Sequence, residues 1–481
     1  MTFAKKWLIA VVVLFLAGLF LLNPFADEQT RDFSEAVEPG KAVAFFDSNG
    51  SCRNCNLVFI SVNVLRADKL GAYGYPRNVT PNLDALAKDG FVFENAFSQS
   101  GWTLPSYASL MTSLYPHVHG VEYRTRMLPD SSLTLAEILQ IYGYNTGAFV
   151  SGNIDSGSYH GLSQGFEVFE NIPGRDFKRL ALKESPRISS AKKWILQNES
   201  FKEPFFLFLE SDDLHCPYGP SYPNNPFLNE SSFGVLNSSQ VNSFCDKEYL
   251  ATNITQGDVG VLNALYDWRL AREDADIGRL IGFLDKKNVL NRTLIVFFSP
   301  HGEEFYDHGF VGPQILYDTV LRVPLIIRVP NKKGGRRTGE LVQLIDVMPT
   351  VLELLGIPIN HQGQGKSAAA FIRGEKWAGN DYVFAEQEDV FRKSSPSPVF
   401  KWSVRSKNWK LVQREGKGEL YNVQEDSLEL SDLLQEKPKE VANLTRVREN
   451  FLDKTRVFEL PRQSTTLSEE AIQNLLAYGY P

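Results

Sequence analysis

Short continuous apolar runs recur along the chain, and they are typical of strands that are buried on both faces of a sheet. Longer segments with capping residues or an amphipathic pattern separate them and predict helices. This alternation predicts an α/β fold with a large, mostly parallel sheet flanked by helices. The four clearest runs are Leu57–Val62, Phe205–Leu209, Thr293–Ser299 and Leu325–Val329.

Capping residues mark the helices between these runs. Thr80 followed by Pro81 supplies an N-cap and a first-turn proline, and Gly90 ends that helix. Asp346 opens a helix that Gly356 closes. Two further helices are expected, one before Gly143 that begins with a capping-box pattern from Thr134 and Glu137, and a long amphipathic one over Leu262–Lys286.

The pattern changes after about residue 375, where short alternating segments replace the buried runs. Trp402–Arg405, Trp409–Val412 and Glu419–Tyr421 predict antiparallel strands, and a helical stretch follows from Lys437 to Lys454. These elements predict a small C-terminal antiparallel α+β subdomain. The expected organisation is an N-terminal segment 1–26, a tether 27–54, a large domain 55–375, the small subdomain 376–460 and a tail 461–481.

The N-terminal segment resembles a signal for export. Lys5 and Lys6 precede Trp7–Leu22, a run without a polar residue that is shorter than the ~20 residues of a usual spanning helix. This pattern is typical of a signal peptide or a short signal anchor. Because Pro24 makes a poor cleavage site, we expect an uncleaved anchor and an extracytoplasmic domain, periplasmic or extracellular. The domain is secreted if the segment is cleaved.

Composition narrows the functional classes. The 481 residues are 43% hydrophobic with a formal net charge of −7, which excludes a disordered chain and argues against a nucleic-acid partner. Four Cys and seven His suffice for one metal site but not for arrays of zinc modules. Export permits disulfides, so we expect Cys52 and Cys55 to form a local one, and Cys216 and Cys245 to bridge a loop.

Polar side chains gather where the buried strands end, which is where open α/β sheets bind ligands. Asn63 follows the first strand, His215 follows the second, and His301 follows the third. A further element places the Thr103 and Ser106 hydroxyls near the start of a helix that Pro105 opens. These strand ends also carry Arg66, Asp68, Glu210, Asp212, Asp213, Glu303, Glu304, Asp307 and His308.

Five ordered stretches resemble the sulfatase family of the alkaline phosphatase superfamily, from about Asn56 to Leu452. They are the segment from NLVFISVNVLRADKLGAYGY through SGWTLPSYASL, the segment ending in LIVFFSPHGEEFYDHG, LYDTVLRVPLIIRVP, LIDVMPTVLELLGI and WKLVQREGKGELYNV. The resemblance implies an alkaline-phosphatase-like fold. It also implies a divalent metal (calcium, magnesium or manganese) beside a nucleophile that attacks a sulfate or phosphate ester.

Several positions depart from the family pattern. Thr103 stands at the nucleophile position, where most sulfatases have a Cys that matures to formylglycine and phosphatase or transferase relatives have Ser or Thr. Asn63 and Pro300 replace two metal-ligating Asp residues. Tyr107 stands at the position of an Arg or His, and Gln314 near that of a catalytic His or Lys. If each lost ligand costs at least ~10–100-fold, the pair weakens metal binding by roughly 10²–10⁴.

The resemblance therefore assigns roles to an incomplete site. Thr103 and His215 are the expected catalytic residues, Asn63, Thr103 and His301 the expected metal ligands, and Ser106, Tyr107 and Gln314 the expected substrate-binding residues. Other roles stay open: Thr103 could cap its helix, and His301 could be a structural hydrogen-bond partner.

Two functional hypotheses follow. The first is an exported, membrane-tethered pseudoenzyme that binds a ligand or partner, with a divalent metal only if the site is functional. The alternative is an active sulfate, phosphate or phosphonate ester hydrolase or transferase that uses Thr103 and a divalent metal. A purely structural role in the cell envelope is a third reading with no residue in its favour. The expected partners are a sulfate or phosphate ester and the membrane.

Overall fold

The computed structural model describes fourteen stretches of the chain, and all statements below concern these. They are residues 45–46, 52–122, 126–151, 160–172, 184–197, 203–215, 225–228, 255–309, 311–313, 315–358, 363–389, 399–414, 416–460 and 462–464. Ala42–Pro481 forms one compact unit. The apolar run Trp7–Leu22 lies outside the described residues, and none of the described helices is both long and apolar enough to cross a membrane.

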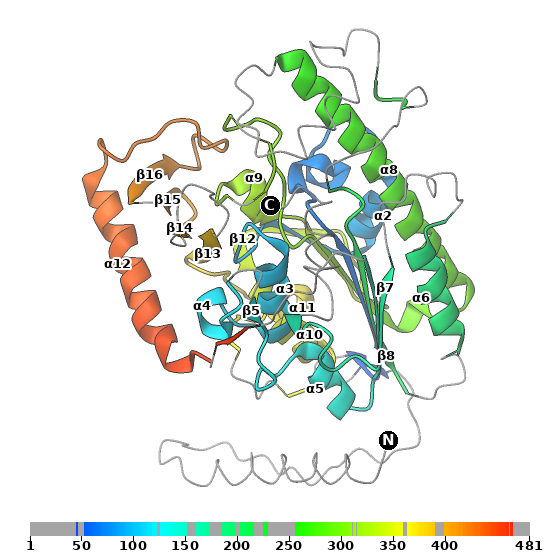
Figure 1. Cartoon of the computed structure of the whole chain (residues 1–481). Helices are drawn as coiled ribbons and strands as arrows, with labels where there is room; N and C mark the ends of the chain where they lie inside the picture. The colour runs from blue at the N-terminus through cyan, green and yellow to red at the C-terminus, as the bar shows by residue number, and fades with distance from the viewer. Residues whose placement is uncertain are drawn as a thin grey trace, which may run out of the picture. The chain divides into compact units, whose positions relative to one another are not determined.

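A nine-stranded mixed sheet forms the centre of this unit (Figure 1). Its parallel part runs in the order β9, β3, β8, β6, β7, with β3 (Asn56–Val62) in register between β8 (Phe205–Ser211) and β9 (Thr293–Phe298). Beyond β8 lie β6 (Asn145–Ser151) and β7 (Val168–Ile172). The predicted mostly parallel α/β sheet is confirmed.

Beyond β9 the sheet changes direction. The strand β11 (Leu325–Arg328) runs antiparallel to β9, and β4 (Phe91–Phe97) runs antiparallel to β11. The strand β12 (Arg336–Gln343) pairs parallel with β4, and the short β10 (Arg322–Val323) pairs with it on the other side. The predicted run Leu325–Val329 is therefore a strand, but an antiparallel one.

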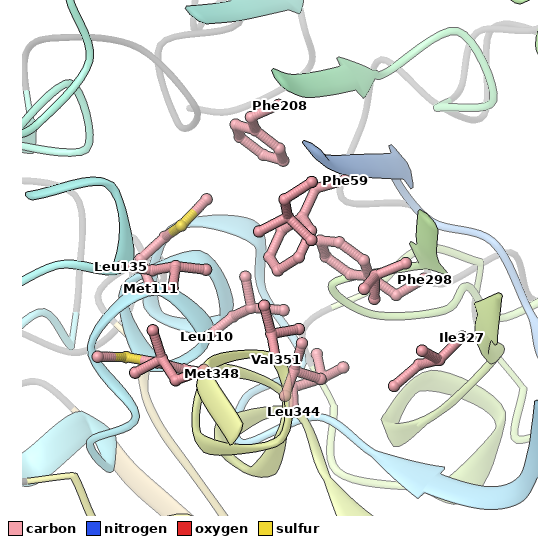
Figure 2. Close-up of a cluster of buried hydrophobic side chains, with 14 of the residues drawn as sticks. Phe59, Leu110, Met111, Leu135, Phe208, Phe298, Ile327, Leu344, Met348 and Val351 are labelled. Carbon is pink, nitrogen blue, oxygen red and sulfur yellow. The ribbon is translucent and has the colours of Figure 1, made fainter. Parts of the chain in front are cut away.

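Alternate side chains of the central strands point to opposite faces, and each face carries its own core. From β3, Leu57 and Phe59 pack on one face, whereas Val58, Ile60 and Val62 pack on the other. Figure 2 shows the first core, where Phe59, Phe208 and Phe298 of three neighbouring strands face apolar side chains of the helices that cover them. Both faces are covered, which explains the continuous apolar runs.

The covering helices divide in the same way (Figure 1). One face packs against α3 (Thr103–Thr112), α5 (Leu135–Ile141), α10 (Val347–Leu354) and α11 (Ala369–Arg373). The other packs against α2 (Pro81–Asp89), α6 (Pro186–Gln197) and α8 (Gln256–Lys286).

The predicted capping signals have mixed outcomes. Thr134 and Glu137 form the expected capping box of α5. The helix α8 is longer than predicted, because Thr255 and Asp258 form a second capping box that starts it earlier. Asp346 does not cap α10 with its side chain, which instead accepts hydrogen bonds from the backbone of Gln343 and Lys366.

The C-terminal elements form an antiparallel sheet with one helix packed on it. The strands follow one another in chain order, and α12 (Pro438–Thr455) lies against the middle two through Leu444. The pattern did not single out the first of the four strands, which are β13 (Val383–Asp389), β14 (Val399–Arg405), β15 (Trp409–Arg414) and β16 (Lys417–Asn422). The predicted small α+β substructure is present.

Small elements complete the described fold. The short pair β1 (Phe45–Phe46) and β2 (Cys52–Arg53) precedes β3, and the Cys52–Cys55 disulfide closes the turn before it, as predicted. Cys216 and Cys245 lie outside the described residues. The remaining pieces are β5 (Arg126–Met127) paired with β17 (Gln463–Ser464), α4 (Pro116–His119) and α9 (Asp318–Leu321).

Candidate active site

Three residues far apart in the sequence meet at the carboxyl end of the central strands. Asn63 follows β3, His301 follows the neighbouring β9, and Thr103 is the first residue of α3. All three side chains are buried. Because β3 and β9 are adjacent and parallel, their ends deliver Asn63 and His301 to the same place, as the sequence predicted.

Hydrogen bonds join the three side chains into a closed set, which we call the Asn63–Thr103–His301 triad. Asn63 Nδ2 donates to Thr103 Oγ1 at 3.1 Å, and Thr103 Oγ1 lies 3.0 Å from His301 Nε2. Asn63 Oδ1 accepts from the backbone N–H of Val64 at 2.9 Å. The Thr103 hydroxyl is therefore committed to two partners within the chain.

The His301 ring has one tautomer that satisfies its contacts. Its Nδ1 lies 2.9 Å from the carbonyl oxygen of Gly302, which can only accept, so Nδ1 carries the proton. The unprotonated Nε2 then accepts from the Thr103 hydroxyl. Burial lowers the pKa of His301 to about 4, against a smaller opposing effect of the Gly302 hydrogen bond, so the ring is neutral near pH 7.

Hydrogen bonds join the loop that carries Asn63 to the loop that carries His301, and join the latter to α9. Leu65 N donates to Ser299 Oγ at 3.1 Å, and Ser299 Oγ donates to the carbonyl of His301 at 2.7 Å. Gly302 N donates to the Val320 carbonyl of α9, and a Cβ at Gly302 would lie 2.3 Å from the Thr319 carbonyl. Only glycine fits at this close approach.

The turn after β3 adopts a backbone conformation that is rare for its residue. Val64 has a φ of 54°, which a β-branched side chain disfavours. The Tyr266 hydroxyl of α8 donates to the Val64 carbonyl at 2.9 Å, and burial is the main cause that raises the pKa of Tyr266. These contacts hold a strained turn that directs Asn63 towards Thr103.

The triad does not fit the divalent metal that the sequence resemblance implies. It offers one amide oxygen, one hydroxyl and one imidazole nitrogen, and it contains no carboxylate. Ca²⁺ and Mg²⁺ require about six or more oxygen ligands and rely on carboxylates for charge. Across the described part of the chain, no group of three or more His, Cys, Asp or Glu side chains is arranged to hold a metal ion.

The three expected substrate-binding residues do not form one group: two are buried around α3, and the third lies outside the described residues. Ser106 Oγ contacts Ser98 Oγ and the carbonyls of Ser100 and Trp102, within the first turn of α3. Tyr107 is buried against the sheet, with its hydroxyl 2.9 Å from Ser61 Oγ. Gln314 lies outside the described residues. A substrate-binding role for these three stays a prediction.

Thr103 does not cap its helix. Trp102 is the N-cap residue of α3 and makes no side-chain cap, and Thr103 already belongs to the helix. The capping alternative for Thr103 is therefore wrong. Its hydroxyl serves the triad instead.

His215 lies at the end of β8 beside a buried ionic cluster that the sequence pattern did not reveal. His215 itself is buried, and its backbone N–H donates to the Asp212 carbonyl. Arg187 of α6 contacts Asp213 at 2.6 Å and Glu273 of α8 at 3.5 Å. Burial opposes ionisation of Asp213, but Arg187 outweighs it and lowers the pKa of that carboxyl. The sequence does not predict that Arg187 is buried, because a lone Arg in a helical segment is typical of a surface position.

Arg66 joins the turn after β3 to the loop after β9. Its guanidinium contacts Asp68 and Asp307, each at 2.7 Å, and donates to the Glu303 carbonyl. Arg66 and Asp68 thus form an ion pair, and Asp307 is a second structural partner of Arg66. The Glu304 carboxylate contacts His308 and Thr319.

His117 and His119 support the segment after α3. His117 lies between Glu386 of β13 and Thr455 of α12, at 2.7 and 2.8 Å. His119 Nδ1 accepts from the Val121 N–H, and its Nε2 lies 3.0 Å from Ser109 Oγ. Burial is the main cause that lowers the pKa of His119 to about 3.

His308 connects the loop after β9 to the C-terminal sheet. Its Nδ1 lies 3.1 Å from Glu304 Oε1, its Nε2 lies 2.9 Å from the Leu428 carbonyl, and its ring stacks on Tyr317. Both partners of the ring nitrogens accept hydrogen bonds, so the ring satisfies both only as an imidazolium. Burial opposes that charge, but Glu304, with a contribution from Glu429, outweighs it and raises the pKa of His308.

This arrangement predicts a pH-dependent contribution to stability. The folded pKa is raised above the ordinary value of about 6.5, so the contribution is complete below that value and is lost as pH rises through the folded pKa. We expect His308→Phe, which keeps the ring stack, to lower the free energy of unfolding most near pH 6. The deficit shrinks towards about pH 9 in urea titrations. A deficit that is independent of pH would show that the imidazolium is not the stabilising species.

Family models match most of the described fold. The Sulfatase model matches residues 55–357, and a model described as N-sulphoglucosamine sulphohydrolase, C-terminal, matches residues 306–456. The two matches together span the nine-stranded sheet and the whole C-terminal sheet. Asn63, Thr103 and His301 all lie within the first.

The chain is also similar to sulfatases of animals and bacteria. It is 25% identical to arylsulfatase K of Rattus norvegicus over 58% of this chain and 56% of that protein. It is 26% identical to an ulvan-active sulfatase of Formosa agariphila over 66% and 65% of the two chains. An arylsulfatase of Clostridium perfringens is 25% identical over 89% and 98%. The chain thus spans less than two thirds of the length of the first two relatives.

Solved structures share the fold at lower identity. A phosphonate monoester hydrolase of Agrobacterium radiobacter has a TM-score of 0.69 with 21% identity, over 86% of this chain and 98% of that one. A structure in complex with its substrate D-glucosamine-2-N,6-O-disulfate has a TM-score of 0.63 with 17% identity, over 84% and 98%. At these identities the likeness concerns the fold alone.

Proposed function

Because the chain belongs to the sulfatase family, we propose that it is a pseudoenzyme of that family, which uses the family fold to bind a ligand or partner and does not hydrolyse esters. The observation that supports this proposal is the Asn63–Thr103–His301 triad, whose side chains hydrogen bond to one another. The nucleophile position is occupied by a hydroxyl that donates to His301 and accepts from Asn63. With both hydrogen bonds in place, Thr103 Oγ1 cannot bind a metal ion and a reacting oxygen at the same time.

The proposed ligand is a sulfate or phosphate ester. A structural neighbour was solved with a disulfated glucosamine as its substrate, and another is a phosphonate monoester hydrolase, so related folds accommodate both kinds of oxyanion. In this chain His215, at the end of β8, is the residue we propose to face the ligand, together with Ser106, Tyr107 and Gln314 as further candidates.

We further propose that the protein is exported and held at a membrane by its N-terminal segment. The support is the basic pair Lys5–Lys6 before the apolar run Trp7–Leu22, followed by Pro24. The Cys52–Cys55 disulfide is consistent with an oxidising compartment.

The Thr103 hydroxyl provides the test of the proposed function. We expect the purified full chain to turn over aryl sulfate and aryl phosphate esters no faster than Thr103→Val, whose isosteric side chain lacks the hydroxyl. We also expect Thr103→Val to lower the free energy of unfolding by about 1–3 kcal/mol, since it leaves the buried Asn63 Nδ2 and His301 Nε2 without their hydrogen-bond partner. Thr103→Ser keeps the hydroxyl and serves as the control in both measurements.

One outcome would contradict the pseudoenzyme. If the wild-type chain turns over an ester and Thr103→Val abolishes that turnover while Thr103→Ser retains part of it, the hydroxyl is a nucleophile.

The second candidate function is an active ester hydrolase or transferase. One observation favours it: the neutral His301 accepts the Thr103 proton at 3.0 Å, which is the arrangement of a hydroxyl nucleophile and its general base. In that case Thr103 Oγ1 would attack the phosphorus or sulfur as His301 Nε2 takes its proton, and the bond to the leaving alcohol would break. His301→Gln would then remove the turnover.

A further inference from the structure

The edge of the sheet where the parallel strands begin lies opposite the candidate active site. Asn145 N donates to the Pro204 carbonyl at 3.0 Å, Phe205 N to Asn56 Oδ1 at 3.2 Å, and Asn56 Nδ2 to Thr293 Oγ1 at 3.3 Å. These contacts join the starts of β6, β8, β3 and β9 into one row. We call this row, with the last turns of the helices that lead into it, the amino edge.

The chain enters the fold in the middle of the amino edge. The Cys52–Cys55 turn leads directly into β3, and the Tyr144 hydroxyl donates to the Cys55 carbonyl at 3.0 Å. The turn between α5 and β6 therefore lies beside the entry point. Everything that precedes β2 in the sequence, including the apolar run Trp7–Leu22, is connected to the fold at this edge.

Large apolar side chains are exposed at the amino edge. Ile141 and Tyr142, at the end of α5, are 60% and 47% exposed, and Leu196, in the last turn of α6, is 41% exposed. The ring of Trp194 contacts that of Phe205, which places the last turn of α6 at the start of β8. Tyr142 combines an apolar ring with a polar tip, as residues at lipid interfaces do.

Basic side chains accompany the apolar ones. Lys193 of α6 and Lys286 and Lys287 at the end of α8 are exposed, and Lys192 Nζ lies 5.6 Å from the ring of Phe283, so the two helix ends are neighbours. Among the described exposed residues of this edge, the basic ones outnumber the acidic ones, although the whole chain carries −7. They are Arg53, Lys193, Lys286 and Lys287 against Glu167, Glu203 and Asp285.

We propose that the amino edge docks on an anionic lipid bilayer. Two kinds of contact favour binding to such a bilayer. Exposed apolar side chains enter the lipid interface, and lysines pair with lipid phosphates. The inference rests on the proposed N-terminal anchor. The chain between Leu22 and Cys52 reaches roughly 3.5 Å per residue when extended, which is ample for the fold to contact the bilayer that holds the anchor.

Docking through this edge has a consequence for function. The carboxyl ends of β3, β8 and β9, with Asn63, His215 and His301, lie at the other end of the strands. The ligand site therefore faces away from the bilayer. Such an orientation suits a ligand that arrives from the aqueous side, and not a lipid headgroup of the same membrane.

Hydrogen exchange of the full chain in lipid nanodiscs tests the proposal. We expect backbone amides of residues 141–145, 193–197 and 285–289 to exchange about tenfold more slowly in nanodiscs that contain phosphatidylglycerol than in nanodiscs of phosphatidylcholine alone. The exposed segment that contains Leu430 serves as the internal control and is expected to exchange equally in both.

Two sets of variants separate the contributions. Lys193→Glu with Lys286→Glu and Lys287→Glu is expected to remove the difference between the two lipids, because charge reversal repels the anionic surface. Ile141→Ser with Tyr142→Ser and Leu196→Ser is expected to reduce the protection in both. Leu430→Ser, which removes an apolar side chain of similar exposure from a distant loop, is the matched control and is expected to change neither.

The possible failures are distinguishable. Flotation with phosphatidylcholine vesicles of the full chain that carries all six of these substitutions measures the anchor by itself. If the chain floats but the amino edge shows no lipid-dependent protection, or if the variants leave the protection unchanged, the docking proposal is wrong and the anchor stands. If the chain does not float with either lipid, both the anchor and the docking are overturned.

Discussion

Replacing Asn63 and Pro300 with aspartate is expected to raise the affinity of the protein for Ca²⁺ or Mn²⁺ by roughly 10²–10⁴. The sequence resemblance predicts metal-ligating carboxylates at both positions, and Asn63 lies beside Thr103, which in turn contacts His301. In the wild-type chain we expect neither EDTA nor added Ca²⁺ to change the melting temperature, because the triad supplies no carboxylate. Metal binding to the native state of the double variant should raise its melting temperature.

The same variant should be less stable than the wild type in EDTA. Two carboxylates in a fully buried site without a cation are costly, and each one costs of the order of several kcal/mol unless it is protonated. Pro300→Asn by itself is the matched control, since it has the shape of the aspartate without the charge. Calorimetry of the variants with Ca²⁺ and with EDTA measures both effects. If Ca²⁺ leaves the double variant unchanged, residues 63 and 300 are not the positions of the family's metal ligands.

Lys410→Met is expected to lower the free energy of unfolding by about 3–5 kcal/mol. Lys410 is fully buried in β15, with its Nζ 2.6 Å from Asp318 of α9 and 2.7 Å from Glu429. Arg405 also contacts Asp318 at 2.9 Å. Methionine fills a similar volume but leaves the buried Glu429 carboxylate without Lys410 and leaves Asp318 paired with Arg405.

The deficit of Lys410→Met should depend on pH. Burial is the main cause that raises the pKa of Glu429, to about 7, and Lys410 opposes that shift. Without Lys410 the pKa rises further, so the deficit grows as pH increases and shrinks as Glu429 takes up a proton in acid. Urea titrations from about pH 5 to about pH 8 measure this trend. Lys407→Met, which removes an exposed lysine paired with Glu340, should cost ~1 kcal/mol or less at every pH.

Lys410 matters for the site as well as for stability. Asp318, its partner, begins α9, and Val320 of the same helix accepts the backbone hydrogen bond of Gly302. His308 makes a second connection, from the loop after β9 to the Leu428 carbonyl. The C-terminal sheet therefore supports the loop that carries His301.

The apolar runs predicted the central strands well, because a strand covered on both faces has no polar position to interrupt the run. β3, β8 and β9 were found in this way. β6 was not, since Asn145–Ser151 contains polar and small residues whose burial depends on neighbours such as Trp194, whose indole would lie 2.7 Å from a Cβ at Gly147. Arg187 and Lys410 were missed for a related reason: a basic side chain signals a surface unless its acidic partners are known, and these come from distant segments.

The sequence by itself determined the α/β class and the two strand ends and one helix start that carry Asn63, His301 and Thr103. Those properties follow from residue types and local spacing, because the burial of apolar side chains and the backbone geometry of strands and helices impose characteristic patterns on the sequence. Only the tertiary structure decided that Asn63, Thr103 and His301 satisfy one another, that Gly302 selects the His301 tautomer, and that Lys410 neutralises Asp318 and Glu429. Hydrogen bonds and buried charges depend on distance and direction between groups that the chain brings together from afar, so no local pattern specifies them.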